Sequence, residues 1–314
     1  MNNTKYTFLL PAYKARFFEE ALLSIKNQTY TDFKVIVSDD CSPEDLKSIY
    51  DKVCADDPRF TFRRNEENMG SKSLVSHWNM LVDICDTEWF IMAGDDDVYE
   101  RAFLEEMDKL QVKYPNVDLL HARVNLIDKN GDVVRMDALY EEYVEQIAFI
   151  SQFNYYRHIE CIGNHIFRRV SVNIINGFPD FPLAWCADTY ATALLSKNGV
   201  ANSYKILFRF RSSGINISSK NNSVIVKQKR MAERMYLLSM EKLLYSVQTD
   251  NSIMMNDELN KLQEINKARM LGYVRKISCL ECYDYVRLCV KCGYFNSIKD
   301  IIGLFIRCLF FRKK

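Results

Sequence analysis

The stretch YTFLLPAYKARFFEEALLSIKNQTYTDFKVIVSDDCS, residues 6–42, predicts a strand, a helix and a second strand in succession. Residues 6–11 and 33–38 are short apolar runs bounded by polar or turn-forming residues, which is typical of buried strands. Between them, the apolar side chains of residues 17–28 recur at the spacing of one helix face: Phe18, Ala21, Leu22 and Ile25. The stretch therefore predicts the first units of an α/β fold.

The alternation continues with a strand over residues 59–64, a helix over 71–85 and a strand over 88–93. Strands that alternate with helices indicate a mainly parallel, Rossmann-like sheet with helices on both faces. Ligands of such sheets bind beyond the carboxyl ends of the strands. Residues 11–13 and the acidic residues 39–40 and 95–97 all fall at the ends of predicted strands, so we expect them to meet at one edge of the sheet.

From about residue 117 the pattern changes. Lys129-Asn130-Gly131-Asp132 has the Asn-Gly signature of a hairpin turn and predicts antiparallel strands that extend the sheet. Helices are expected near 141–154 and after 187, and strands at 165–169 and 205–211. The polar run of residues 212–223 is the predicted linker, and the chain beyond it is predicted to be helical. We therefore predict an α/β domain over residues 1–220 and a C-terminal helical region over 221–314.

Composition restricts the class of protein. A chain of 314 residues with 48% hydrophobic residues supports a large packed core, and a net charge of +1 excludes a uniformly basic nucleic-acid-binding protein, so we expect no nucleic-acid partner. Ten cysteines in a chain of this size do not indicate a secreted disulfide scaffold, and the N-terminus lacks an apolar signal core. No run of 18 uncharged apolar residues predicts a membrane span. We expect a cytoplasmic protein, with peripheral attachment to the inner face of the cell membrane as a further hypothesis.

Three adjacent carboxylates, Asp95, Asp96 and Asp97, come directly after the apolar run of residues 89–92. Carboxylates packed at a strand end are typical of a site for a hard divalent cation that also binds phosphate oxygens. The alternative is that they cap a helix that begins near Arg101. A second acidic pair, Asp39 and Asp40, at another strand end favours the cation site.

Residues 11–42 resemble the opening of glycosyltransferase family 2, whose members begin much like PxYNxxxxLxxxLxSxxxQTYxxxEIIVxDDxS. The resemblance continues through Asn68-Met69-Gly70, through Asn79 ahead of Thr87-Glu88-Trp89-Phe90, and through Gly94-Asp95-Asp96-Asp97. It extends to Asn176-Gly177-Phe178 and Trp185-Cys186-Ala187-Asp188, and covers roughly residues 5–220. The order and spacing of these short motifs carry the resemblance.

This resemblance implies a GT-A fold that binds a nucleotide-diphosphate sugar and inverts the anomeric carbon during transfer. It implies that Asp40 binds the base, usually uracil, flanked by the backbone of Pro11, Ala12 and Tyr13, and that Asp95 meets the ribose. By the same resemblance, Asp96 and Asp97 bind a divalent cation, Mg or Mn, Arg211 lies near the diphosphate, and Asp188 is the catalytic base.

Two positions depart from the family's commoner pattern. The family often has an Asp two residues before the paired acids, where this chain has Ala93, so the choice of metal-binding carboxylate stays open within the cluster. Many GT-A enzymes have a metal-binding His two residues after the late Arg, where this chain has Ser213. For Arg211 itself, a salt-bridged surface role is the alternative, and for Asp188 the alternative is a helix N-cap.

The predicted function is an inverting, metal-dependent glycosyltransferase that uses a nucleotide-sugar donor and a glycan or lipid-linked acceptor. The resemblance implies a UDP-linked donor and a role in surface polysaccharide or lipopolysaccharide assembly. A sugar-nucleotide nucleotidyltransferase is a rival, but its chemistry calls for a Gly-rich phosphate loop and residues 11–16 contain no glycine. A non-catalytic sugar-nucleotide binding module is the second rival.

Two further groups of residues raise the question of metal binding. Cys279, Cys282, Cys289 and Cys292 form two CxxC pairs, but on one helix the outer sulfurs would lie on the order of 20 Å apart, so we interpret them as small buried side chains. The four histidines show no spacing typical of metal ligands and are interpreted as structural: His77, His121, His158 and His165.

The C-terminus concentrates the positive charge. From Lys267 onward there are 11 basic residues against three acidic ones, a net +8, and because the whole chain is +1 the preceding residues carry −7. As a helix, residues 294–314 would have a broad apolar face and end in Arg312-Lys313-Lys314. This pattern predicts binding to an anionic membrane surface, and packing of the apolar face on the catalytic domain is the alternative.

Overall fold

A computed structural model describes residues 4–155, 158–220, 222–247 and 253–274, and six single positions beyond them: Tyr283, Arg287, Lys299, Ile302, Gly303 and Ile306. The chain divides into two compact units, Met1–Val226 and Lys227–Lys314. The four cysteines of the C-terminal CxxC pairs lie outside the described residues, so their interpretation stays a prediction.

The first unit is built on one sheet whose strand order is β3-β2-β1-β4-β9-β6-β10-β5, with β7 paired to β6 and β8 to β10. Its strands are β1 (Tyr6–Ala12), β2 (Phe33–Asp39), β3 (Phe60–Arg64), β4 (Trp89–Met92), β5 (Val98–Tyr99), β6 (Leu119–Ile127), β7 (Val133–Met136), β8 (Tyr143–Val144), β9 (His165–Arg168) and β10 (Val200–Arg211). Its α-helices are α1 (Phe18–Lys26), α2 (Leu46–Cys54), α3 (Gly70–Ile84), α4 (Phe103–Lys113), α5 (Gln146–Tyr155), α6 (Arg169–Ile174) and α7 (Ala187–Leu195).

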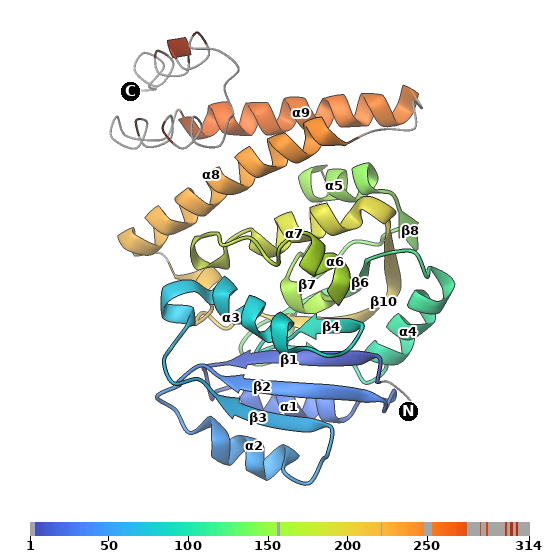
Figure 1. Cartoon of the computed structure of the whole chain (residues 1–314), viewed down its shortest axis with the longest axis vertical. Coiled ribbons are helices and arrows are strands. Elements are labelled where there is room, and N and C mark those ends of the chain that lie inside the picture. Colours follow the sequence, from blue (N-terminus) through green and yellow to red (C-terminus); the bar gives the residue numbers. More distant parts are fainter. Residues whose placement is uncertain are drawn as a thin grey trace. The chain divides into compact units, whose positions relative to one another are not determined.

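Strands β3, β2, β1 and β4 run parallel, as the strand-helix alternation predicts. Figure 1 shows these strands in blue and teal in the lower part of the view. Beyond them β9 pairs antiparallel with both β4 and β6, and β6 and β10 are parallel to each other. The predicted hairpin at residues 129–132 is confirmed, since β6 and β7 pair antiparallel around it. The α/β class is confirmed, and the sheet combines a parallel half with antiparallel additions.

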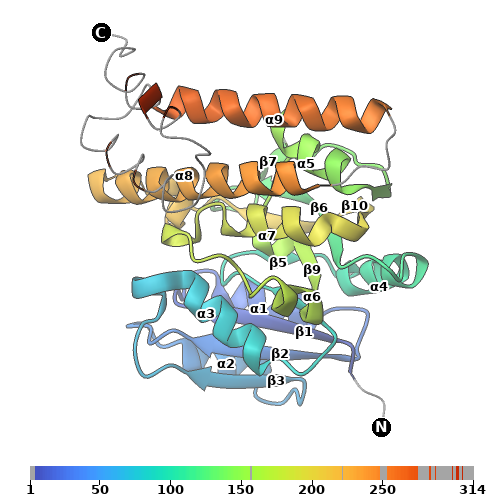
Figure 2. The ribbon, with the colours of Figure 1, turned by 45° about the horizontal axis from the view of Figure 1, so that its top comes forward.

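Alternation along β1 divides the core between the two faces of the sheet. Tyr6, Phe8 and Leu10 pack with the buried faces of α1, α2 and α4 in one continuous cluster. On the opposite face Phe90 packs against Phe167 and Phe178, and Phe178 also contacts Trp78 of α3. Figure 2 shows α3 and α6 on this second side of the strands. Period-two burial thus produces a sheet covered on both faces.

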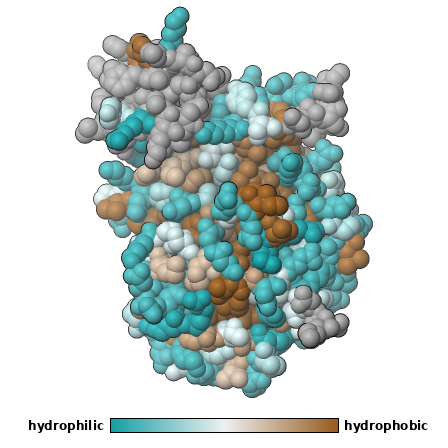
Figure 3. Space-filling view, in the orientation of Figure 1, coloured by the Kyte–Doolittle hydropathy of each residue, from teal (hydrophilic) through white to brown (hydrophobic). Residues whose placement is uncertain are grey.

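The second unit contains most of α8 (Ser223–Ser246) and α9 (Ile253–Val274), drawn in orange in Figure 2. The buried Asn266 amide joins them, donating to Glu241 Oε2 at 2.6 Å and to the Leu237 carbonyl at 3.1 Å. Among the described residues, no helix has both the length and the hydropathy needed to cross a bilayer. On the face in Figure 3, hydrophilic side chains predominate and apolar ones form small separate groups.

Candidate active site

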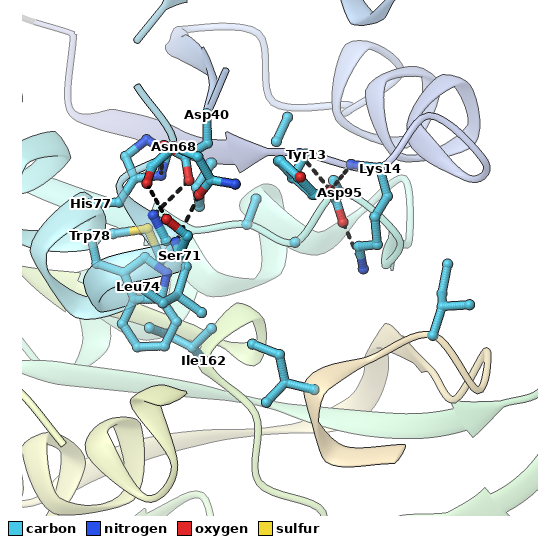
Figure 4. Close-up of a pocket in the computed structure, with 18 of the residues that line it drawn as sticks. Tyr13, Lys14, Asp40, Asn68, Ser71, Leu74, His77, Trp78, Asp95 and Ile162 are labelled. Atoms are coloured by element: carbon cyan, nitrogen blue, oxygen red, sulfur yellow. Dashed lines mark hydrogen bonds and ion pairs between the residues drawn. The ribbon is translucent and has the colours of Figure 1, made fainter. Parts of the chain in front are cut away.

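The carboxyl ends of β1, β2 and β4 meet at one edge of the sheet, beside a cavity of about 370 Å³. This is the edge at which a parallel sheet binds ligands. Five of the residues predicted to bind a donor line the cavity: Pro11, Ala12, Tyr13, Asp40 and Asp95. Figure 4 shows Asp40 with Asn68 and His77 at one end, and Asp95 with Tyr13 and Lys14 at the other.

Asp40 is a buried carboxylate held by the start of α3. Its Oδ1 accepts hydrogen bonds from the Met69 amide and the Asn65 side chain, both at 2.9 Å, and its Oδ2 accepts one from the Gly70 amide at 2.7 Å. A Cβ atom on Gly70 would lie 2.9 Å from Oδ2, so this position requires glycine for the close approach. The bonds fix the carboxylate in position, and Oδ2, which accepts only one of them, retains acceptor capacity.

The neighbouring Asp39 has a different role from Asp40. Its carboxylate is completely buried, accepts a hydrogen bond from the Ser42 amide at 2.8 Å and forms an ion pair with Arg64. Between the two acids and Ser42, Cys41 adopts a left-handed backbone conformation with φ of 53°. This strained residue turns the chain so that Asp39 braces the loop while Asp40 lines the cavity.

Lys14 supplies the positive charge next to the acidic cluster. Its Nζ lies 3.0 Å from Asp95 Oδ1 and 2.6 Å from Asp96 Oδ2. Asp95 Oδ2 also accepts hydrogen bonds from the Tyr13 and Lys14 amides, each at 2.8 Å. These bonds tie the loop after β1 to the loop after β4. The sequence pattern did not single out Lys14.

Arg211 holds the same cluster from the other side. Its amide donates to Asp97 Oδ1 and its Nε donates to the Asp96 carbonyl, both at 2.9 Å, while its guanidinium pairs with Glu20 at 2.6 Å. The side chain is 2% exposed, which excludes the alternative of a surface salt bridge. Its predicted contact with a diphosphate stays a prediction, and in this structure its described contacts position the acidic loop.

The position of Ser213, where many relatives have histidine, is used within its own loop. Ser213 Oγ donates to Asn216 Oδ1 at 2.7 Å, and Asn216 Nδ2 donates to Asp96 Oδ2 at 3.3 Å and to the Arg211 carbonyl at 2.9 Å.

The alternative in which the acidic cluster caps a helix is wrong, because α4 begins after Ala102 and has no side-chain cap. The cluster therefore needs another explanation.

The acidic cluster has more negative charge than its partners offset. Asp95, Asp96 and Asp97 are each 6% exposed. Burial, and after it repulsion from Asp96, raises the pKa of Asp97 well above its usual value, and burial also raises the pKa of Asp96. Oxygen ligands with surplus negative charge fit a divalent cation such as Mg or Mn. Gly94 permits this packing, since a Cβ there would lie 2.6 Å from Asp97 Oδ2.

Asp188 is the second residue of α7, so it is not the N-cap, which is Cys186. Its Oδ1 accepts a hydrogen bond from the Thr189 amide at 2.9 Å, and burial raises its pKa. The preceding turn contains three non-glycine residues with positive φ: Leu183, Ala184 and Cys186. Strained backbone of this kind gathers at functional sites. Four of the predicted site residues do not line the cavity itself: Asp96, Asp97, Asp188 and Arg211.

Sequence patterns missed several residues of the cavity. His77 Nε2 lies 2.9 Å from Ser38 Oγ and its Nδ1 lies 3.6 Å from Asp40 Oδ1, so it packs beside Asp40 and supports it. Burial lowers the pKa of His77, which favours the neutral ring. Trp78 and Ile162 supply an apolar wall. The helical periodicity of α3 was the available signal for Trp78, but it indicates burial and not a ligand.

Comparison with known proteins agrees with this geometry. The family model described as Glycosyl transferase family 2 matches residues 7–174, more than half of the chain. An uncharacterized glycosyltransferase of Methanocaldococcus jannaschii is 29% identical over 121 residues, 38% of this chain and 41% of that protein. A GalNAc(5)-diNAcBac-PP-undecaprenol β-1,3-glucosyltransferase of Campylobacter jejuni is 30% identical over 131 residues, 41% of this chain and 40% of that protein. The matches thus span about two fifths of these curated relatives.

Solved structures share the fold over nearly the whole chain. Residues 1–349 of S. aureus TarS, in complex with UDP-GlcNAc, align with a TM-score of 0.67 and 17% identity, covering 97% of this chain and 81% of that one. The mannosyltransferase PcManGT from Pyrobaculum calidifontis, in complex with GDP-Man and Mn²⁺, aligns with a TM-score of 0.54 and 13% identity, covering 99% and 88%. With the GT-A fold and the family match established, the chain belongs to glycosyl transferase family 2.

Proposed function

We propose that this glycosyltransferase is an inverting, metal-dependent enzyme that transfers a sugar from a nucleotide-diphosphate donor to a hydroxyl group of a glycan or lipid-linked acceptor. The observation that carries the proposal is one cavity lined by both Asp40 and Asp95, next to the buried acids Asp96 and Asp97. A nucleoside needs polar partners for its base and its ribose, and a diphosphate needs cations beside them. In this proposal Asp40 and Asp95 supply the polar partners, and Asp96 and Asp97 hold the cation.

The base is the first part of the donor to consider. The Asp40 carboxylate accepts hydrogen bonds, so it fits a base that presents an N–H group, and both uracil and guanine do so. Pro11, Ala12 and Tyr13 would flank the base, and Asp95 would meet the ribose. We favour a UDP-linked donor. The solved neighbours bind UDP-GlcNAc in one case and GDP-Man in another, so the panel of donors must include both nucleotides.

Asp96 and Asp97 are the residues that would hold a divalent cation. When bound, the cation would act as a Lewis acid for the negative charge that develops on the leaving diphosphate. Lys14 and the backbone held by Arg211 position these carboxylates. Changing Asp96 and Asp97 to Asn one at a time and measuring the Mn²⁺ affinity of each variant would show which carboxylate binds the cation directly.

Asp188 is the proposed general base. It would accept the proton of the acceptor hydroxyl while that oxygen forms a bond to the anomeric carbon, and the bond from this carbon to the diphosphate oxygen breaks with its electron pair leaving on the diphosphate. Attack from the face opposite the leaving group inverts the configuration. The raised pKa of Asp188 makes it a better proton acceptor once it is ionised.

We further propose a catalytic domain over residues 1–220 and a helical region over 221–314 that brings the enzyme to anionic lipid. The basic C-terminus supports this, as does the undecaprenol-linked substrate for which the Campylobacter jejuni relative is named. The same two observations favour a lipid-linked acceptor at the inner face of a cell membrane, in surface polysaccharide or lipopolysaccharide assembly.

The direct test is a panel of UDP-, GDP- and dTDP-sugars incubated with the full chain, with and without Mn²⁺, and assayed for released nucleoside diphosphate. We expect hydrolysis of one donor class that depends on the metal. The Asp40→Asn variant should lose donor affinity by about tenfold or more, the scale of a hydrogen bond to a charged group. The Asp86→Asn variant, which changes an exposed acid, should behave as the parent.

Two outcomes would replace the proposal. Tight donor binding without hydrolysis or transfer to any acceptor would identify a binding module. Release of pyrophosphate from a nucleoside triphosphate and a sugar phosphate would identify a nucleotidyltransferase.

A further inference from the structure

Two histidines that are far apart in the sequence lie directly opposite each other in the sheet. His121 of β6 and His165 of β9 are register partners across the antiparallel pair, so their imidazoles stand on the same face. Their ring centroids are 5.1 Å apart and both side chains are fully buried. Glu160, from the segment before β9, places its Oε1 3.5 Å from His165 Nε2. One ligand atom from each of the three residues lies within 4.8 Å of the others.

The hydrogen bonds around His165 determine which nitrogen faces Glu160. His165 Nδ1 lies 3.1 Å from the Cys161 carbonyl, which only accepts, so Nδ1 carries the proton and Nε2 has a lone pair. An ionised Glu160 carboxylate is also an acceptor. Two acceptors that face each other at this distance repel unless a proton or a cation lies between them.

A single proton does not satisfy this cluster. Four of its buried atoms have no hydrogen-bond partner among the described residues: both ring nitrogens of His121, His165 Nε2 and Glu160 Oε2. A proton on Glu160 would serve His165 Nε2, and Asn202 Oδ1 can accept from one ring nitrogen of His121. The second ring nitrogen of His121 and Glu160 Oε2 would still have no partner within the described part of the chain. Buried polar atoms without partners are unfavourable and rare in native proteins, so the cluster calls for a ligand that binds all three side chains.

We propose that His121, Glu160 and His165 bind a divalent transition-metal ion of the zinc class, at a site separate from the donor cation site. In a tetrahedral zinc site, neighbouring ligand atoms are about 3.4 Å apart, given metal–ligand distances near 2.1 Å. The 3.5 Å between His165 Nε2 and Glu160 Oε1 matches this ligand-to-ligand distance. The third ligand atom, from His121, needs a shift on the order of 1 Å through side-chain rotation to reach the same distance from the other two ligand atoms.

The surroundings of the three side chains fit metal ligation. All three side chains are buried, which favours neutral imidazoles, the form that ligates, but also raises the pKa of Glu160, so a bound metal ion would have to displace the Glu160 proton. The Cys161 carbonyl orients His165, and Thr192 Oγ1, from α7, contacts Glu160 Oε1 at 3.1 Å. Such outer contacts are typical of histidine and carboxylate ligands. Two imidazoles and one carboxylate favour zinc over Mg or Mn, whereas the donor site offers carboxylates.

A metal ion bound here would join three segments of the fold. It connects β6, β9 and the segment before β9, and Thr192 ties that segment to α7, the helix that begins next to Asp188. The inference is independent of the donor and of the acceptor. It would stand if the proposed reaction were replaced, because its test measures bound metal and not activity.

The test begins with the full-length protein. Metal content is measured by elemental mass spectrometry after purification without chelator, and again after chelation and reloading with Co²⁺. Because the chain has many cysteines, the measurements are repeated on a variant with Cys279, Cys282, Cys289 and Cys292 all changed to Ser. We expect one equivalent of zinc or cobalt per chain to remain in both proteins after gel filtration has removed ions from the weaker carboxylate site, and a visible Co²⁺ spectrum of tetrahedral intensity without thiolate charge-transfer absorption.

Variants then assign the ligands. In the background with the four C-terminal cysteines changed to Ser, Glu160→Gln and His165→Gln should each lower Co²⁺ affinity by at least tenfold. His77→Gln, which changes a buried histidine outside the cluster whose Nε2 lies 2.9 Å from Ser38 Oγ, should retain the spectrum, and so should Asp96→Asn combined with Asp97→Asn. Should the ligand variants fail to fold, the parent protein still decides. A folded parent that neither contains metal nor binds added Zn²⁺ or Co²⁺ at this stoichiometry overturns the proposal and leaves a protonated Glu160 as the explanation.

Discussion

Lys14 Nζ lies 2.6 Å from Asp96 Oδ2, so the acidic cluster at the end of β4 already has one cation of its own. Although burial acts to lower it, the carboxylates of Asp95 and Asp96 raise the pKa of Lys14, which keeps the ammonium charged. The opening pattern of the family, PxYN, has asparagine where this chain has Lys14, which is a third departure from that pattern. A lysine here must affect how the cluster binds a metal ion.

The first prediction concerns this ammonium. Replacing Lys14 with Met removes a unit charge close to the proposed metal ligands and should raise the Mn²⁺ affinity of the nucleotide-free protein by about tenfold or more. Lys14→Arg keeps the charge and should behave as the parent. Isothermal titration calorimetry measures both. Equal or weaker Mn²⁺ binding by Lys14→Met would mean that the lysine does not compete with the metal.

The second prediction concerns Asp96 and Asp97 together. Changing both to Asn should abolish Mn²⁺-dependent nucleotide binding without unfolding the protein, because the substitutions remove buried negative charge that the structure only partly offsets. Nucleotide binding is measured with and without Mn²⁺, and folding by circular dichroism. The Asp86→Asn variant is the control. Unchanged Mn²⁺-dependent affinity in the double variant would rule out these residues as the metal site.

These residues illustrate what the sequence could predict. Asp40 and Asp95 come shortly after strands whose apolar runs are local, and parallel strands bring their carboxyl ends together, so their convergence was predictable. The hairpin at residues 129–132 was predictable for the same reason, because its turn signal is contained within four residues.

Other features depend on contacts that no local pattern contains. The insertion of β9 between β4 and β6 places His165 opposite His121, and the order of strands in a sheet is set by packing of distant segments. The positive φ values of Leu183 and Cys186 are also invisible in the sequence, because neither residue type favours that conformation. The ion pair of Lys14 with Asp96 depends on the same long-range packing.

The third prediction concerns Asp188 and pH. If Asp188 is the general base, Asp188→Asn should retain donor affinity and lose transfer by about a hundredfold or more. Burial raises the pKa of Asp188 from its ordinary value of 3.8, so the parent enzyme should lose kcat/KM as pH falls through this raised pKa, since the protonated acid cannot accept a proton. The variant should lack this acidic limb. Near-normal turnover in the variant would return Asp188 to a structural role in α7.

The last prediction concerns the C-terminus, most of which lies outside the described residues. Two of its apolar residues are described: Ile302 is 51% exposed and Ile306 is 45% exposed, four positions apart at helical spacing. Because residues at this spacing share a helix face, exposed isoleucines here favour insertion into lipid. The basic residues Arg312, Lys313 and Lys314 would add attraction to anionic headgroups.

We therefore expect the full chain to co-sediment with vesicles that contain phosphatidylglycerol, less so with phosphatidylcholine alone, and less at high salt because ions screen the attraction. Ile302→Asn combined with Ile306→Asn should reduce binding to both vesicles, whereas neutralising Arg312, Lys313 and Lys314 to Gln should remove only the preference for anionic lipid. Val133→Asn with Val134→Asn changes exposed apolar residues of the first unit and is the matched control. Loss of folding in the isoleucine variant, or binding equal to the parent, would favour packing of this segment on protein over contact with a membrane.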